Sequence, residues 1–578
     1  MDIKRTVLIL GLAIVSYALV VQWNNDYGDQ AGTVAITQNA VAGDLPAADT
    51  VTDDLPVASD EQSGESNSLA PVASATSNAL IRVETDVLQL AIDPQGGDIV
   101  DLRLSQYPKR SSQPDVPFQL FENSGERLYV AQSGLVGSNG PDARSSGRPL
   151  YASAQQDYVL QPGQDSLDVD LQFSENGITY TKRFTFYRGL NEKCSPRDIE
   201  QRKKNCVNEQ AYQIGVSHLV DNQSEEPWRG NLFAQLKRDG QGDPSSTTAT
   251  GTATYLGAAL WTPDEPYKKL KMGTMDDKNF KQSIEGGWIA WLQHYFVTAW
   301  VPAADSTNTV STRKDAAGNY IIGYTGPAVQ VAPGDHARMD ATLYAGPKNQ
   351  ATLKKLSPGL ELTVDYGFLW FLAQPIFWLL TVIHSMLGNW GWSIIVLTVL
   401  IKLAFFPLSA ASYRSMARMR AVAPKIQALK EQAGDDRQKL SQGMMELYKK
   451  EKINPLGGCL PILVQMPVFL SLYWVLLESV EMRHAPWMFW ITDLSIKDPL
   501  FILPIIMGAS MFVQQLLNPP PPDPMQAKVM KLLPIIFTFF FLWFPAGLVL
   551  YWVVNNLLSI AQQWYITRQI EKATASKN

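Results

Sequence analysis

The hydrophobic and polar positions of the chain form four successive patterns. Residues 7–21 are apolar, and residues 22–80 are mostly small and polar. Hydrophobic and polar positions then alternate over 81–347 with the period of two that is typical of β-strands. From Tyr366 onward the chain holds apolar runs of about 16 to 20 residues, the length of membrane-spanning helices. The pattern therefore predicts a water-facing β domain joined to a helical membrane part.

The first apolar run predicts an uncleaved transmembrane anchor over residues 1–23. Lys4 and Arg5 precede the run, which favours a cytoplasmic start, and no small-x-small cleavage site follows it at once. The next residues, up to Leu80, hold nine acidic side chains and no Lys or Arg. Such a composition cannot bury enough apolar area to offset the entropy of ordering. We therefore expect a disordered acidic tether over residues 24–80.

Residues 81–347 predict a large antiparallel β domain, most simply a sandwich. The segment LDVDLQFSENGITYTKRFTFYRG is typical of a hairpin, with Glu175, Asn176 and Gly177 at the bend. Paired carboxylates with flanking aromatic residues, as in sugar-processing sites, are not evident in the sequence. We therefore expect a structural or docking role for this domain and no enzymatic activity, with sugar binding as a conceivable alternative.

The net charge changes sign along the chain. Residues 1–365 hold 31 Lys and Arg against 44 Asp and Glu, whereas residues 366–578 hold 18 against 11. The long apolar runs of the second, basic part exclude a purely soluble enzyme. The acidity of the whole chain, with a net charge of −6, argues against nucleic-acid recognition as its main task.

The three cysteines and five histidines do not form a metal-binding pattern. No HxxxH or CxxC spacing occurs, so no metal or other cofactor is expected, and the absence of a Walker A sequence argues against an ATP-driven step. Cys194 and Cys206 lie in a polar insertion, where an exported location allows a disulfide and two free thiols are the alternative. Cys459 lies among apolar residues and is interpreted as a small packed side chain.

The membrane part is predicted to cross the bilayer five times after the anchor. A preceding apolar segment, Phe368–Leu387, contains Pro375 and two tryptophans, and either spans the bilayer or lies in its interface. A bend at Phe544-Pro545-Ala546-Gly547 divides the last apolar stretch into two crossings. The stretches that contain the five spans are residues 393–408, 460–480, 500–517 and 529–565, the last counted twice.

The distribution of Lys and Arg predicts the orientation of these spans. Residues 409–458 hold ten Lys and Arg against five acidic residues, so we expect them in the cytoplasm. Apolar residues recur there at helical spacing on both sides of Gly434, which indicates a two-helix hairpin. Lys or Arg flanks both ends of 529–565, so both termini of the chain are expected in the cytoplasm.

Lys402 interrupts an otherwise apolar span, about 9 Å from its predicted cytoplasmic end. A charge in a span costs roughly 2.5–3.5 kcal/mol at the centre of the bilayer. Its ammonium group either snorkels to the headgroups or lies in a water-containing groove open to the cytoplasm. Other polar residues of the spans favour the groove, although each alone could be a helix–helix hydrogen bond. They are Thr398, Gln465, Tyr551, Asn555 and Ser559.

Three long segments resemble the Gram-negative form of the YidC/Oxa/Alb family of membrane protein insertases. They read NPLGGCLPILVQMPVFLSLYWVL, DPMQAKVMKLLPIIFTFFFLWFPAGLVLYWVVNN and SYRSMARMRAVAPKIQALKEQAGDDRQKLSQGMMELYKKEKINP. The resemblance covers the whole chain. It implies insertion and folding of nascent inner-membrane proteins, alone or with the Sec translocon, through a hydrophilic groove open to cytoplasm and lipid. It also implies contacts with membrane lipids and, weakly through cytoplasmic loops, with the ribosome.

The resemblance assigns further parts of the chain. It implies a periplasmic β-supersandwich at 81–347, a linker and interfacial helix at 348–390, an α-helical insertase core at 391–570 and a short tail at 571–578. In the groove, Lys402 matches a basic position that is often Arg in the family, and Thr398 matches a threonine one turn earlier. Trp552 stands where the family often has Tyr, which puts a hydroxyl role at that position in doubt.

Two other functions compete with an insertase. A small-solute transporter would use the same polar residues, but no inverted repeat of the spans is evident. A membrane-anchored carbohydrate-binding protein would keep its activity in the exported domain alone. The clients, the oligomeric state and the contribution of the β domain do not follow from the sequence.

Overall fold

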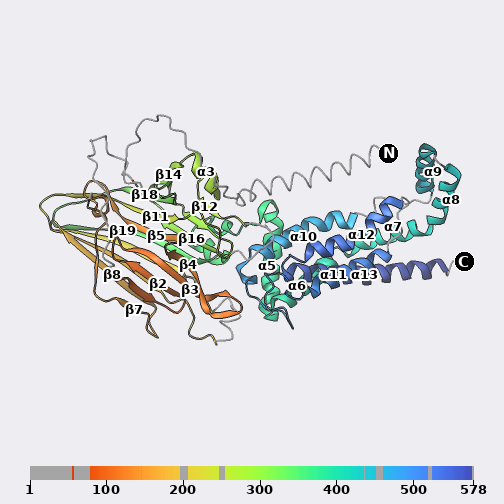
Figure 1. Ribbon diagram of the computed structural model, residues 1–578, viewed down its shortest axis with the longest axis horizontal. Coiled ribbons are helices and arrows are strands. Elements are labelled where there is room, and N and C mark those ends of the chain that lie inside the picture. Colours follow the sequence, from red (N-terminus) through yellow and green to blue (C-terminus); the bar gives the residue numbers. More distant parts are fainter. Residues whose placement is uncertain are drawn as a thin grey trace. The chain divides into compact units, whose positions relative to one another are not determined.

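The computed structural model consists of two compact units, one up to Val364 and one from Asp365 (Figure 1). The first is built mainly of strands and the second of helices. The predicted anchor at 1–23, and all but a few residues of the predicted tether at 24–80, lie outside the described residues. The structure describes residues 55–56, 79–144, 146–195, 206–245, 254–434, 436–450, 460–517 and 524–575.

The strand unit contains a ten-stranded sheet. Its neighbours are antiparallel, except that β1 and β7 are parallel. In spatial order the strands are β14 (Lys281–Glu285), β17 (Thr307–Lys314), β18 (Tyr320–Val331), β11 (Trp228–Arg238), β5 (Leu128–Val136), β4 (Gln113–Asn123), β3 (Asp98–Arg110), β2 (Leu88–Asp93), β1 (Ile81–Glu84) and β7 (Asp157–Val159).

A second, nine-stranded sheet is antiparallel throughout. Two short α-helices, α3 (Met272–Asp277) and α4 (Gln350–Leu356), and the 3-10 turns Pro141–Ala143 and Leu360–Thr363 accompany the sheets. The strands in spatial order are β13 (Lys268–Leu270), β12 (Gly257–Leu260), β15 (Ile289–Leu292), β16 (Phe296–Pro302), β19 (Asp335–Pro347), β10 (Gln213–Asn222), β9 (Ile178–Tyr187), β8 (Ser166–Glu175) and β6 (Ala152–Ser153).

The two sheets form the predicted sandwich, in which strands such as β9 bury every second side chain and others, such as β5, bury nearly all of them. In β9 buried and half-buried positions alternate over all ten residues. The predicted bend between β8 and β9 is confirmed, since Asn176 and Gly177 both have positive φ (52° and 77°), as a two-residue hairpin turn requires. Phe118 of one sheet stacks on Phe296 of the other, with ring centroids 4.4 Å apart. Burial of such rings in the shared core stabilises the sandwich.

A disulfide joins Cys194 and Cys206, which decides between the two alternatives that the sequence leaves open. The sulfurs connect the two ends of the polar insertion, whose Cα atoms are 5.6 Å apart. Cys206 is buried, and its carbonyl accepts a hydrogen bond from the backbone N–H of Asn191 at 3.0 Å. The disulfide and this hydrogen bond therefore hold Cys206 close to the residues that follow β9.

Charged side chains are buried in the strand unit and link the two sheets. The Lys182 ammonium on β9 donates to the carbonyls of Gly96 (3.1 Å) and Ser133 (2.8 Å), and Ser133 lies on β5 of the opposite sheet. Arg148 donates to the same two carbonyls, at 3.0 and 2.8 Å, and forms ion pairs with Asp98 and Asp142. Burial lowers the pKa of Lys182 to about 7, opposed by the nearby Asp98.

The helical unit contains nine α-helices, counted over its described residues, and two 3-10 turns at Gly367–Leu369 and Val480–Met482. The predicted break at Phe544–Gly547 is present, since one helix ends at Phe541 and the next begins at Ala546. In chain order the helices are α5 (Trp370–Leu387), α6 (Trp390–Ala404), α7 (Phe406–Ala421), α8 (Ala423–Ala433), α9 (Arg437–Lys450), α10 (Leu460–Glu478), α11 (Ile502–Leu517), α12 (Pro524–Phe541) and α13 (Ala546–Ala575).

The connection between α6 and α7 differs from the prediction. The sequence predicts a span that continues to Leu408, but α6 ends at Ala404 and Pro407 is the second residue of α7. Proline is tolerated in the first turn of a helix, where its missing N–H has no intrahelical acceptor. The two helices meet at an angle of 66°. Phe405 is the single residue between them.

The predicted hairpin at 409–458 is shorter than expected. Helix α7 continues to Ala421, so only α8 and α9 surround the turn at Gly434, where the predicted centre lies. Met416 and Met419, which lie within the predicted hairpin segment, belong to α7, because that helix continues without a break through both residues. Residues 451–459 lie outside the described part of the chain.

One helix in the described residues, Gly367–Leu387, is long and apolar enough to cross a membrane by itself. The bent pair α6 and α7 raises the number to two if it is one span. Val464–Glu478 and Ile502–Leu517 are apolar but shorter. Length and composition of the helices therefore do not reproduce the count of five spans, which stays a prediction.

We expect the stability of the strand unit to rise with pH because of Lys182. Its pKa is about 7 in the folded chain and about 10.4 when unfolded, so between these values the unfolded chain binds more protons. The stability of the natural protein relative to Lys182→Met should then increase by about 2 kcal/mol from about pH 7 to about pH 9. Pulse proteolysis of the full chain in urea, read on fragments of the strand unit, measures this difference.

The substitution Lys182→Met leaves both carbonyls hydrogen-bonded, because Arg148 donates to them as well. Lys281→Met, at an exposed position of β14, is the matched control and should give a difference that does not depend on pH. A pH-independent difference for Lys182→Met would contradict the lowered pKa.

Candidate functional site

Lys402, the charged side chain of the apolar helix α6, is hydrogen-bonded to a neighbouring helix. Lys402 lies in the last turn of α6, and its Nζ donates a hydrogen bond to Ser559 Oγ on α13 at 2.7 Å. The Ser559 hydroxyl in turn donates to the backbone carbonyl of Asn555, one turn earlier, at 2.7 Å. Among the described residues no carboxylate lies within ion-pair distance of Lys402. The ammonium group is therefore partnered by a hydroxyl and keeps its charge uncompensated.

A third helix joins the same group of polar side chains. The Gln465 amide on α10 donates to Asn555 Oδ1 on α13. Lys402, Gln465, Asn555 and Ser559 thus connect α6, α10 and α13 through side-chain hydrogen bonds. We call these four residues the polar cluster. Because α13 supplies two residues spaced by four, both lie on one face of that helix.

A narrow pocket lies beside the polar cluster. Lys402 and Gln465 line it together with Phe405 and with apolar residues of α6, α7 and α10. It holds about 10 Å³ of space for the centre of a water molecule, which is about the room for one water. The pocket therefore combines the charge of Lys402 with two polar side chains, Ser409 and Gln465, and four apolar ones.

The other predicted groove residues contribute to the packing of the helices. Thr398 is buried and donates to the Ile394 carbonyl of its own helix at 2.6 Å, so its hydroxyl is used within α6. Tyr551 is buried and stacks on Phe469, with ring centroids 6.2 Å apart. Trp552 also packs against Phe469, at 5.0 Å. The buried indole N–H of Trp552 has no hydrogen-bond partner in the described part of the chain.

A second polar contact was not predicted as a pair. Asn556 of α13 donates to Ser510 Oγ of α11 at 3.1 Å, and both side chains are buried. Next to it, Gly508 lets α12 approach closely, since a Cβ there would lie 1.9 Å from Thr538 Oγ1. The sequence offers a weak signal for this contact in the small residues Gly508-Ala509-Ser510. Small residues are frequent where helices pack in membranes.

The outer surfaces of the helices around the polar cluster are apolar. Four large side chains on α11 and α12 are 60–66% exposed, although water would make such exposure unfavourable. Helices that place polar side chains inside and apolar ones outside are typical of proteins surrounded by lipid. The four residues are Ile505, Leu516, Ile535 and Phe539.

The chain matches two family descriptions. The model described as "60Kd inner membrane protein" matches residues 382–573, and the one described as "YidC periplasmic domain" matches residues 80–190 and 195–379. Together they cover the polar cluster and the sandwich.

Curated relatives match over the full length. Membrane protein insertase YidC of Ectopseudomonas mendocina (strain ymp) is 70% identical over 584 residues, which covers 100% of both chains. The protein of the same name from Pseudomonas aeruginosa (strain PAO1) is 68% identical over 576 residues, which covers 99% of both. Both relatives are named as insertases, in agreement with the expectation of a non-enzymatic function.

A solved structure described as an active YidC insertase with its first transmembrane domain resolved is 17% identical, with a TM-score of 0.38. The match covers 85% of this chain and 93% of that one. The chain belongs to the YidC family of membrane protein insertases.

Proposed function

We propose that the chain inserts nascent inner-membrane proteins and helps them to fold, using the polar cluster as the contact for the hydrophilic part of each client. The observation that carries the proposal is the hydrogen bond from Lys402 to Ser559, which holds a cation inside a group of helices with apolar outer surfaces. Such a cation is costly in an apolar environment, so a function for it is the natural explanation.

The mechanism follows from the placement of charge and apolar surface. A nascent apolar segment carries a polar flank that must cross the bilayer. Water and charge between the helices shorten the part of the crossing in which the flank is surrounded by a low dielectric. Acidic residues of the flank are attracted to Lys402 and exchange with its single hydroxyl partner, Ser559. The apolar segment then moves along the exposed apolar side chains of the helices into lipid, and its burial there drives the step without a nucleotide.

The lack of an ionic partner for Lys402 makes this exchange inexpensive, and the pocket beside it sets what a client must do to enter. Lys402 has no carboxylate partner in the described residues, so an arriving acidic group does not have to break an ion pair. The pocket beside Lys402 has room for about one water, so a client has to widen the space between α6 and α10 to enter. The amide of Gln465 and the hydroxyl of Ser559 then remain as hydrogen-bonding groups for its polar flank.

The proposed topology follows the distribution of charge. Both termini and the basic residues 409–458 lie in the cytoplasm, where the positive-inside rule places them, and the sandwich lies in the periplasm. We place α5 in the interface, because Trp370, Phe371 and Trp378 are all more than half exposed and aromatic residues favour that layer. Nascent membrane proteins, the Sec translocon, membrane lipids and, weakly, the ribosome are the proposed partners.

The sign of the charge at position 402 should decide the insertion of clients with acidic flanks. At a separation of about 10 Å and an effective dielectric constant of about 20, one unit of charge contributes on the order of 2 kcal/mol. Lys402→Glu should therefore reduce insertion of such a client about tenfold or more, while Lys402→Arg retains most of it. Protease protection of the client in cells with matched expression of both variants is the measurement.

The matched control is the same client with its flank acids replaced by their amides. Its insertion should differ little between Lys402→Glu and Lys402→Arg, because the charge–charge term is gone. Equal insertion of the acidic client by both variants would remove the proposed role of the cation.

Water should reach the polar cluster but not the neighbouring outer surface. In a Cys459→Ala background, Lys402→Cys should react several-fold faster with a small charged methanethiosulfonate reagent than Leu403→Cys, because thiolates form only where water enters. Leu403 is adjacent in sequence and 60% exposed on the outer, apolar surface of α6, which makes it the matched control. Equally slow labelling of both thiols in membranes, with full labelling in denaturant, would refute a wet groove at Lys402.

A further inference from the structure

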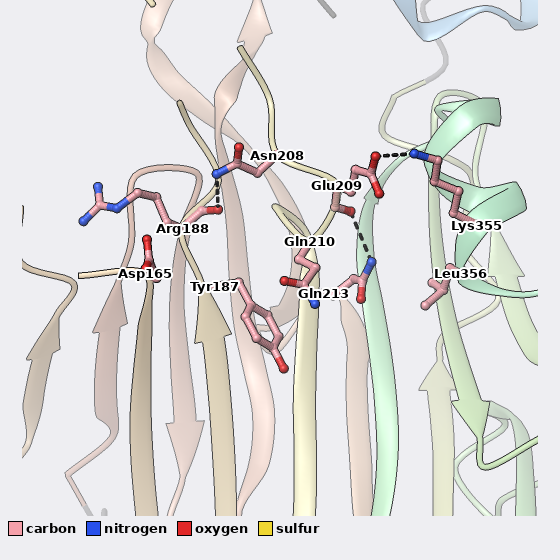
Figure 2. A pocket seen from close by; sticks show the side chains of 9 residues that line it. All are labelled: Asp165, Tyr187, Arg188, Asn208, Glu209, Gln210, Gln213, Lys355 and Leu356. Atoms are coloured by element: carbon pink, nitrogen blue, oxygen red, sulfur yellow. Dashed lines mark hydrogen bonds and ion pairs between the residues drawn. The ribbon is translucent and has the colours of Figure 1, made fainter. Parts of the chain in front are cut away.

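The strand unit has a polar pocket of about 520 Å³, lined only by residues of that unit. Its size is within the range of small-molecule sites, which have volumes of about 300–1,000 Å³. Asp165 lies just before β8, Tyr187 ends β9 and Gln213 begins β10, so the pocket is at one end of the nine-stranded sheet (Figure 2). The end of α4 closes the other side with Lys355.

The wall of this pocket is fixed before any ligand arrives. Asn208 is two residues beyond the disulfide-bonded Cys206, and its backbone N–H donates to the Gly189 carbonyl at 2.8 Å. Its side-chain amide donates to the carbonyl of Arg188 at 3.0 Å, which ties the loop to the residue after β9. The disulfide and these two bonds hold the loop on the sheet. A rigid wall lowers the entropic cost of binding.

The basic side chains of the pocket are already engaged. The Arg188 guanidinium donates to the carbonyls of Gln161 (2.6 Å) and Gln164 (2.7 Å). Lys355 forms an ion pair with Glu209, as the dashed line in Figure 2 marks. The two positive and two negative groups of the lining, with Asp165 as the second acid, cancel in formal charge. The pocket is therefore suited to an uncharged ligand.

Three side chains of the lining have no side-chain hydrogen bond to any described residue. They are the carboxylate of Asp165, the hydroxyl of Tyr187 and the amide of Gln210. Figure 2 shows Tyr187 and Gln210 near the centre, between Asp165 and Glu209. A carboxylate accepts hydrogen bonds, an amide both donates and accepts, and a tyrosine offers a ring face as well as a hydroxyl.

We propose that this pocket binds a neutral carbohydrate of one or two sugar units. Sugar hydroxyls donate to Asp165 and exchange hydrogen bonds with Gln210, and the C–H face of the sugar ring packs on Tyr187. An anionic sugar meets the unpaired carboxylate of Asp165 and is disfavoured. The proposal does not rest on the insertase function, because none of these residues belongs to the helical unit.

Saturation-transfer NMR on the full chain in lipid nanodiscs tests the proposal. The neutral probes are galactose, glucose, N-acetylglucosamine and maltose, and galacturonate is the anionic probe. At least one neutral sugar should bind with a Kd of roughly 1–10 mM, and galacturonate several-fold more weakly. Asp165→Asn and Tyr187→Ala should each weaken the binding about fivefold or more. Asp305→Asn, at an exposed loop position away from the pocket, should leave it unchanged.

Each outcome decides for or against the pocket. Tyr187→Phe keeps the ring and should retain most of the binding, which separates loss of stacking from loss of folding in Tyr187→Ala. Absence of saturation transfer to all four neutral sugars at about 50 mM would overturn the proposal. So would binding that Asp165→Asn and Tyr187→Ala leave unchanged, or binding of a hydrophilic peptide in place of the sugars. Client insertion by Asp165→Asn should equal that of the natural protein, so a failure of sugar binding would not contradict the proposed insertase function.

Discussion

A charged amine among apolar helices is tolerated only where another group accepts its hydrogen bonds. In this chain the acceptor is the hydroxyl of Ser559, and Ser559 is itself bonded to the turn of α13 before it. The positions of α6 and α13 therefore depend on each other, and Gln465 extends the dependence to α10. Apolar packing alone would permit many rotations of these helices about their axes, because lipid tails and apolar side chains are equally hydrophobic. The polar cluster selects one of them.

The strand unit answers the same problem of buried charge in a different way. There Lys182 and Arg148 share two backbone carbonyls, and Asp98 and Asp142 neutralise the arginine. The partners of both cations are supplied by the fold, so this network joins the two sheets. Lys402 has one neutral partner and keeps its charge available. The difference between a structural and a functional cation thus lies in the number and charge of its partners.

Local structure could be predicted correctly where the sequence pattern extends over only a few residues. The alternation along β9 and the Asn176–Gly177 turn lead directly to a hairpin, and the spacing of Asn555 and Ser559 places them on one helix face. The same spacing also includes Tyr551, whose ring packs against Phe469. Periodicity identifies a face of a helix but not which of its residues meet a polar neighbour.

Contacts between distant residues could not be predicted from one sequence. Nothing in the neighbourhood of Lys182 indicates that Arg148 shares its acceptors. The small residues around Ser510 indicate close helix packing, but not that Asn556 is the partner. Thr398 has the right spacing for the groove, yet its hydroxyl is satisfied by the helix carbonyl four residues before it. The pocket of the strand unit combines residues from the ends of three strands, a loop and a helix, so it has no local sequence signature.

The corner at Phe405 has a geometric consequence for the chain that follows it. Lys402 lies three residues before the corner, in α6. Tyr413 and Met416 lie after it, in α7, and pack against Ile566 of α13. Each residue advances a helix by about 100° around its axis. One residue more or less at the corner would therefore turn α7 away from α13 while the amine kept its place. The length of this one-residue connection, more than the identity of its side chain, therefore determines the direction of α7.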